Sequence, residues 1–183
     1  TFLGMTPHEY VRYDARGNGL SDWDVETVSL DAFVTDLETV ADAAGLERFP
    51  LFGMSQGVAV CIAYAVRHPE RVSHLVLYGG FALGGHLRSE AERAKREAMT
   101  ALMRLGWDAD EPTFRQMFAS QMLPDATKEQ LQIFNEHQRR STSGACAARY
   151  FETVGHIDVR GLLGRVEAPT LVLHQRGDLI API

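Results

Sequence analysis

The sequence has few cysteines, no long apolar run and no basic cluster, and each absence excludes a class of protein. Its two cysteines, Cys61 and Cys146, form no metal-binding or redox pattern. The longest unbroken apolar run, Val58 to Val66, is too short to cross a bilayer, and no signal peptide is recognisable. The net charge of −6 argues against nucleic acid as a partner. We therefore expect a cytoplasmic protein with no metal, no cofactor, no membrane contact and no nucleic-acid partner.

The order of apolar segments indicates a parallel α/β sheet. The chain has 183 residues, 45% of them hydrophobic, which is enough for one domain with a core. Strand-like segments alternate with helix-like ones along the chain. The predicted strands are 9–14, 49–52, 72–78 and 170–174, and the predicted helices among them are 30–44 and 58–66. Such alternation is typical of a parallel sheet flanked by helices.

A run of helices interrupts this alternation before the last strand. Helices are predicted at 89–105, from 112, from 128 and from 143 to about 154. Glu92 and Arg96 have the i,i+4 spacing of a helical ion pair, and Thr127 to Gln130 fits a capping box. We therefore divide the chain into a core, residues 1–85 and 166–183, and a helical cap insertion, residues 86–165, which would lie over the strand ends as a lid.

Several apolar residues in and near this insertion could line a pocket. They are Phe81, Trp107, Phe114, Met117 and Phe118. Packing between the lid helices is the alternative role for each of them. In the loop after the first predicted strand, we expect Arg16 and Asp14 to brace the chain rather than to take part in chemistry.

Residues 53–57 read Gly-Met-Ser-Gln-Gly and fit the Gly-x-Ser-x-Gly pattern of a nucleophile elbow. A short apolar strand pattern precedes them and a long apolar helix pattern follows. A serine on such a sharp turn presents its hydroxyl above the sheet edge. We expect Gly53 and Gly57 to be required because a side chain at either flank would clash with the neighbouring strand or helix. The alternative is a tight turn in which Ser55 only caps the helix.

Four segments, in order, resemble the α/β-hydrolase fold family. They are residues 13–21 (YDARGNGLS), 53–57 (GMSQG), 67–72 (RHPERV) and 168–178 (APTLVLHQRGD). The resemblance extends over essentially the whole chain and implies a partial α/β-hydrolase sheet with a helical cap. Residues 14–24 and 75–80 further resemble a bacterial subgroup that is associated with nucleotide cyclases or transcriptional regulators.

The resemblance implies catalytic roles by position. Ser55 would be the nucleophile, with Gly53 and Gly57 shaping its turn, and the backbone N–H of Gln56 would be one oxyanion-hole donor. Asp178 would be the acid that orients a histidine; the alternative is an ordinary turn aspartate after a strand.

Two parts that the family implies are not found in this sequence. The family's catalytic histidine follows the acid after one further strand, and a His-Gly loop precedes the first predicted strand, but neither is present. Of the histidines present, His86 is nearest the expected site, either lining the pocket or solvated in a loop. We therefore expect a fragment truncated at both ends and inactive by itself.

These observations predict a serine hydrolase. It would act on a small molecule with a carboxylic ester, thioester or lactone-like acyl bond, and it would form an acyl-enzyme at Ser55. The alternative is a ligand-sensing domain of a regulatory protein that keeps the fold without catalysis.

Overall fold

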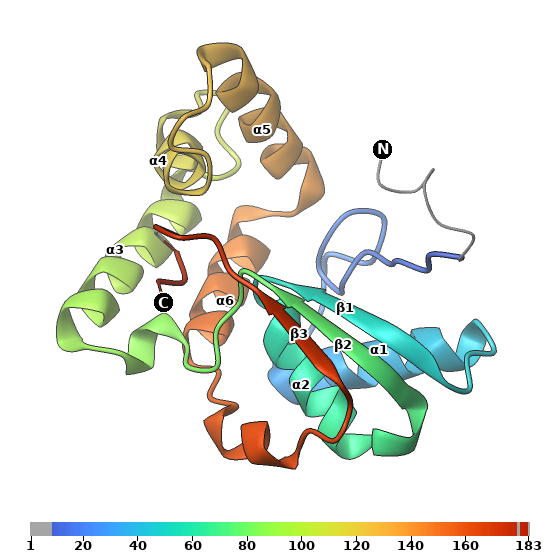
Figure 1. Ribbon diagram of the computed structural model, residues 1–183. Helices are drawn as coiled ribbons and strands as arrows, with labels where there is room; N and C mark the ends of the chain where they lie inside the picture. Colours follow the sequence, from blue (N-terminus) through green and yellow to red (C-terminus); the bar gives the residue numbers. More distant parts are fainter. Residues whose placement is uncertain (1–8, 179, 183) are drawn as a thin grey trace.

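Three parallel strands form the centre of the computed structural model, which describes residues 9–178 and 180–182. They are β1 (Phe49–Met54), β2 (Val72–Tyr78) and β3 (Thr170–Leu173), in the order β1-β2-β3 (Figure 1). Phe52 pairs with Val76, and Val76 pairs with Leu171, so one register runs across the sheet. The predicted class, a parallel α/β sheet flanked by helices, is confirmed.

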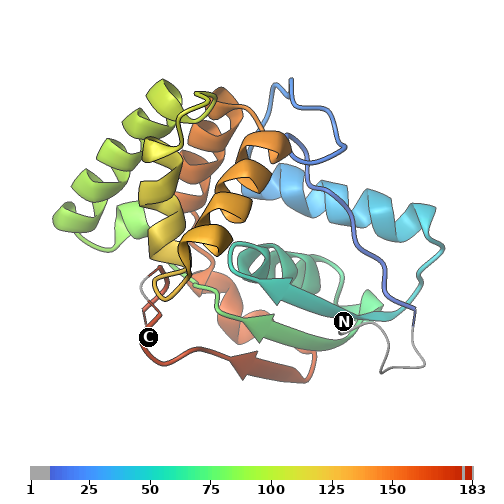
Figure 2. The same ribbon diagram turned by 90° about the horizontal axis from the view of Figure 1, so that it is seen from above.

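Helix α2 (Gly57–Arg67) packs on β1 and β2, and α1 (Leu30–Ala43) packs against α2 (Figure 2). Residues 58–65 of α2 are buried without interruption. This burial explains why the segment is apolar on every side rather than amphipathic. Helix α1 begins where the Ser29 hydroxyl accepts a hydrogen bond from the Ala32 N–H, and the chain leaves it at Gly45 with a φ of 66°.

The opposite face of the sheet carries exposed apolar side chains. Because successive residues of a strand point to opposite faces, paired residues form rows across the sheet. One row joins Met54, Tyr78 and Leu173, and the next joins Phe52 and Leu171 through Val76. Five of these six side chains are exposed, and Val76 is half-buried.

Four helices lie beyond the carboxyl ends of the strands, toward which the arrowheads point (Figures 1 and 2). They are α3 (Glu90–Gly106), α4 (Thr113–Met122), α5 (Lys128–Ser141) and α6 (Gly144–Gly155). The predicted capping box joins Thr127 and Gln130 at the start of α5. A small apolar core forms where α3 and α6 meet, and it contains Met99, Met103, Trp107, Ala147 and Ala148. None of the described helices is long and apolar enough to cross a membrane.

Short 3₁₀ turns complete the secondary structure in the connections. They are η2 (Pro69–Arg71), η3 (Gly85–Leu87) and η4 (Arg160–Arg165). The turn η3 packs against α3 and α6, so it links the sheet to the four helices.

Two local predictions are wrong. Residues 9–14 form no strand, because a strand needs a hydrogen-bonded neighbour and none of the three described strands pairs with them. Glu92 pairs with Lys95, at 3.0 Å between Oε1 and Nζ, instead of with Arg96. The Arg96 side chain turns inward, where its Nη2 donates to the Phe151 carbonyl at 2.7 Å. Residues 1–8 of the predicted core lie outside the described residues.

The loop at 15–22 is held by polar contacts to α1 and α6. Arg16 forms two hydrogen bonds with Asp36 of α1, at 2.7 Å from Nε to Oδ2 and 2.6 Å from Nη2 to Oδ1. On the other side, Thr142 at the end of α5 donates its hydroxyl to the Gly17 carbonyl at 2.6 Å, and the Tyr150 hydroxyl of α6 donates to the Arg16 carbonyl. Asp14 Oδ2 accepts the Leu20 N–H at 3.0 Å. Arg16 and Asp14 therefore brace the loop, as the sequence predicts.

We predict that Asp36→Asn lowers the free energy of unfolding by about 1–2 kcal/mol, because it removes the charge from a half-buried bidentate pair. Glu152→Gln is the matched control, since Glu152 forms an exposed ion pair with Arg104 at 3.0 Å. The control should change the free energy by no more than about 0.5 kcal/mol. Urea unfolding measures both values, and equal losses in the two variants would contradict the prediction.

Candidate active site

Ser55 occupies a sharp turn between β1 and α2. Its φ is 54°, and it is the only non-glycine residue in the described part of the chain with a positive φ. This left-handed conformation is strained for a residue with a side chain and is the conformation of a nucleophile elbow. The Ser55 N–H donates to the Tyr78 carbonyl at 3.0 Å, which ties the turn to β2. The residue in the capping position of α2 is Gln56, and it caps without a side-chain hydrogen bond, so the alternative role of Ser55 as a helix cap is wrong.

Close backbone approaches hold this turn. A β-carbon on Gly53 would lie 2.8 Å from the Gly57 carbonyl oxygen, so the expected clash at Gly53 is confirmed. The clash expected at Gly57 is wrong, since a β-carbon there would meet no described atom within 4 Å. Gly57 begins α2 with open space beside it. The second close approach is at Gly80 instead, where a β-carbon would lie 2.8 Å from the Ser55 carbonyl oxygen and closer still to Val58.

The backbone N–H of Gln56 lies at the start of α2, where Gln56 is the capping residue. Within residues 9–178 and 180–182 it has no hydrogen-bond acceptor. The first N–H groups of a helix lack partners within the helix, and the helix dipole makes this end electropositive. An oxygen that becomes negative beside Ser55 could therefore accept a hydrogen bond from this group.

Asp178 follows β3 at the same edge of the sheet. Its Oδ1 accepts the N–H groups of Ile180 and Ala181 at 2.8 and 2.9 Å, which is the turn role that the sequence left open. Its Oδ2 accepts no hydrogen bond from the described residues and lies 3.8 Å from His174 Nε2. A β-carbon on Gly79 would also lie 3.8 Å from Oδ2. Asp178 therefore adjoins the Gly79–Gly80 turn, whose other end adjoins Ser55.

Among the described residues, no histidine forms a hydrogen bond with Ser55. His86 is buried, with its ring stacked on His156 at 4.4 Å between centroids, and its Nδ1 lies 3.2 Å from Arg96 Nε. Both positions considered for His86, pocket lining and solvated loop, are therefore wrong. Burial, followed by the charges of His156 and Arg96, lowers the pKa of His86. The residue that sequence reasoning missed is His137, which lines the pocket described next.

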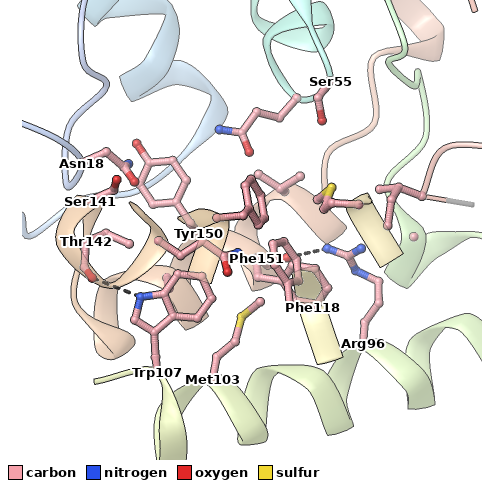
Figure 3. A pocket seen from close by; sticks show the side chains of 18 of the residues that line it. Asn18, Ser55, Arg96, Met103, Trp107, Phe118, Ser141, Thr142, Tyr150 and Phe151 are labelled. Atoms are coloured by element: carbon pink, nitrogen blue, oxygen red, sulfur yellow. Dashed lines mark hydrogen bonds between the residues drawn. The ribbon is translucent and has the colours of Figure 1, made fainter. Parts of the chain in front are cut away.

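A cavity of about 280 Å³ lies between Ser55 and the four helices (Figure 3). Ser55 is at one edge of it, opposite Met103 and Trp107. Of the predicted lining residues, Phe81, Trp107 and Phe118 line this cavity, and Phe114 and Met117 do not. Phe114 packs on Gly106 instead, and Met117 is exposed. The other apolar lining residues are Met103, Met122, Phe134, Ala147, Phe151, Val154 and Ile180.

Polar side chains lie on two sides of the cavity. Figure 3 shows Asn18, Ser141 and Thr142 on one side and Arg96 on the other. Trp107 Nε1 donates to the Thr142 carbonyl at 3.1 Å, which fixes the indole ring against the first group. The cavity therefore combines an apolar wall with a few fixed polar groups, as small-molecule sites do.

We predict opposite effects of an added methyl group at the two elbow glycines. Gly53→Ala should lower the free energy of unfolding by about 1–3 kcal/mol, because the β-carbon meets the Gly57 carbonyl. Gly57→Ala should raise it by about 0.4–1 kcal/mol, because the methyl group meets open space and the unfolded chain loses freedom. Denaturant unfolding of both variants tests this pair, and destabilisation by Gly57→Ala comparable to that by Gly53→Ala would contradict it.

Comparison with known proteins agrees with this geometry. The model of the alpha/beta hydrolase fold family matches residues 7–121. The AB hydrolase superfamily protein YisY of Bacillus subtilis is 29% identical over 179 residues, which are 94% of this chain and 65% of that protein. Pyrrolizixenacetamide deacetylase of Xenorhabdus hominickii is 28% identical, over 94% of this chain and 64% of its own length.

Solved structures give the same result. An esterase from Exiguobacterium antarcticum superposes with a TM-score of 0.79 at 20% identity, over 92% of this chain and 63% of its own. A hydrolase from Pseudomonas aeruginosa superposes with a TM-score of 0.73 at 26% identity, over 93% and 63%. This chain thus spans a little under two thirds of the length of these proteins. The match to the family model, the fold and the elbow agree, and the chain belongs to the α/β hydrolase fold family.

Proposed function

We propose that Ser55 is the nucleophile of a hydrolase that acts on a carboxylic ester, thioester or lactone-like acyl bond of a small molecule. The observation that carries this proposal is the φ of 54° at Ser55, in a turn that opens onto the cavity. A strained backbone at a pocket edge is typical of a functional residue. The names of similar proteins, an esterase and a deacetylase among them, support hydrolysis.

The proposed reaction has two stages. Ser55 Oγ attacks the acyl carbonyl carbon, the carbonyl oxygen becomes negative and accepts a hydrogen bond from the Gln56 N–H, and the leaving group departs with a proton. Water then attacks the acyl-enzyme and releases the acid. Stabilisation of the charged oxygen by a fixed backbone donor lowers the barrier in both stages.

The reaction also needs a base, since a serine hydroxyl is a weak nucleophile until its proton is removed. Because none of the described histidines forms a hydrogen bond with Ser55, we place the base histidine and the second oxyanion donor outside residues 9–178 and 180–182. The part of the chain described here would then be inactive by itself. Asp178 would orient that histidine through Oδ2, the oxygen that accepts no hydrogen bond from the described residues.

The division into a core, residues 1–85 and 166–183, and a cap, residues 86–165, fits this chemistry. The cap would exclude water from the acyl bond and supply the apolar wall that holds the acyl or alcohol part of the substrate. Support comes from the position of α3–α6 beyond the strand ends, with Met103 and Trp107 opposite Ser55 (Figure 3).

The nucleophile can be tested by labelling the protein, expressed from its complete coding sequence, with a fluorophosphonate probe. We expect labelling that Ser55→Ala abolishes, because only an activated serine attacks phosphorus. Ser141→Ala is the matched control, since Ser141 lines the same cavity and its hydroxyl donates to the His137 carbonyl at 2.6 Å. Labelling that persists in Ser55→Ala would refute the assignment. Tight binding of a small molecule without labelling or turnover would favour the ligand-sensing alternative.

Asp178→Asn tests the acid. We expect kcat of the complete protein to fall by about 10³–10⁴-fold, because an amide does not hold the histidine in the tautomer that accepts the serine proton. The free energy of unfolding should change little, since the amide oxygen can still accept the N–H groups of Ile180 and Ala181. A loss of stability with kcat unchanged would assign Asp178 to the turn alone.

A further inference from the structure

Arg96 enters the cavity wall from α3 without a carboxylate partner among the described residues. Its Nη2 donates to the Phe151 carbonyl at 2.7 Å, its Nε lies 3.2 Å from His86 Nδ1, and its guanidinium carbon is 3.8 Å from the centre of the Phe151 ring. These contacts fix the guanidinium in place but leave its charge unneutralised. Nη1 has no hydrogen bond to any described residue.

Arg88 lines the same cavity and is also without a carboxylate partner in the described part of the chain. Its Nε donates to the Leu83 carbonyl at 2.9 Å and its Nη1 to the Ile180 carbonyl at 3.4 Å, and its guanidinium lies over the Phe81 ring. Its Nη2 is not engaged by the described residues. Each of the two arginines thus has one Nη group that no described residue binds.

The two positive charges act on each other. Burial, and then the charge of Arg88, lower the pKa of Arg96 to about 10. Arg96 is therefore still charged at neutral pH, in a cavity whose wall is mostly apolar. The acidic residue that acts on Arg96, Glu92, is itself paired with Lys95. Elsewhere in the fold, arginines such as Arg16 have a carboxylate partner. A partly buried positive pair without counter-charge is unfavourable, and a bound anion would relieve it.

We propose that Arg88 and Arg96 bind a carboxylate group of the substrate, so that the acyl compound cleaved at Ser55 is an anion. The planar fork of a guanidinium matches the two oxygens of a carboxylate, and free Nη groups on two arginines give it two separate donors. The apolar wall between the arginines and the other end of the cavity would hold the carbon chain. The claim that this anion is cleaved at Ser55 rests on the proposed function. The claim that the two arginines bind a carboxylate does not.

Binding without turnover tests the inference independently of catalysis. The complete protein carrying Ser55→Ala is titrated calorimetrically at pH 7 with monomethyl adipate, which has one carboxylate and one ester, and with the neutral dimethyl adipate. We expect the monoester to bind about tenfold tighter or more, the effect of a charge-assisted hydrogen bond. Arg88→Gln and Arg96→Gln, each added to Ser55→Ala, should reduce this ratio to about 3 or less.

Arg93→Gln is the matched control, since Arg93 is an exposed arginine on the same helix that does not line the cavity. It should leave the ratio unchanged. Equal affinity for the two esters, or a ratio that survives both Arg88→Gln and Arg96→Gln, would overturn the inference. If Arg96→Gln prevents folding, the question is decided by the affinities of the two esters for Ser55→Ala alone and for Ser55→Ala with Arg88→Gln. Failure of Ser55 labelling alone would refute the nucleophile and not this binding site.

Discussion

Two backbone approaches at the carboxyl ends of β1 and β2 leave no room for a β-carbon, and the whole site depends on them. Gly53 lies against the first residue of α2, and Gly80 lies against Val58 and the Ser55 carbonyl. These approaches bring α2 close to the sheet and hold the turn in which Ser55 has its strained conformation and Gln56 begins the helix. A wider gap would move the hydroxyl and the backbone donor together, because both belong to one turn.

The parts of the fold that sequence could predict are those determined by neighbours along the chain. The Thr127–Gln130 capping box involves residues three apart, and the structure has it as expected. Residues 9–14 have the composition of a strand, but a strand also requires a partner at its edge, which local sequence does not specify. In the same way, Arg96 has the helical spacing to reach Glu92, yet tertiary packing turns it toward Phe151.

In the candidate site, too, sequence could predict the features that depend on neighbours along the chain and not those that depend on tertiary contacts. The elbow motif locates Ser55 and Gln56 because its five residues form one turn. The sequence could not show that the second close approach is at Gly80 and not at Gly57. Gly80 follows β2, and this strand lies beside the turn only in the folded chain. Which aromatic residues line the cavity depends on the rotation of each helix, so Phe118 faces it and Phe114 does not. Nothing in the sequence indicated that Arg96 faces the cavity, because a helix rich in charge is usually a solvated one.

The pocket wall formed by the loop at 15–22 and the elbow are expected to form at different stages of folding. The Thr142 hydroxyl reaches the Gly17 carbonyl across 125 positions of sequence, and Tyr150 reaches the Arg16 carbonyl across 134. The contacts of β1, α2 and β2 lie within one short stretch of chain. Closing a long loop costs more entropy than closing a short one, and distant contacts slow folding. The turn that carries Ser55 can therefore form early in folding, whereas the wall that contains Asn18 is completed only when the two ends of a long chain segment meet.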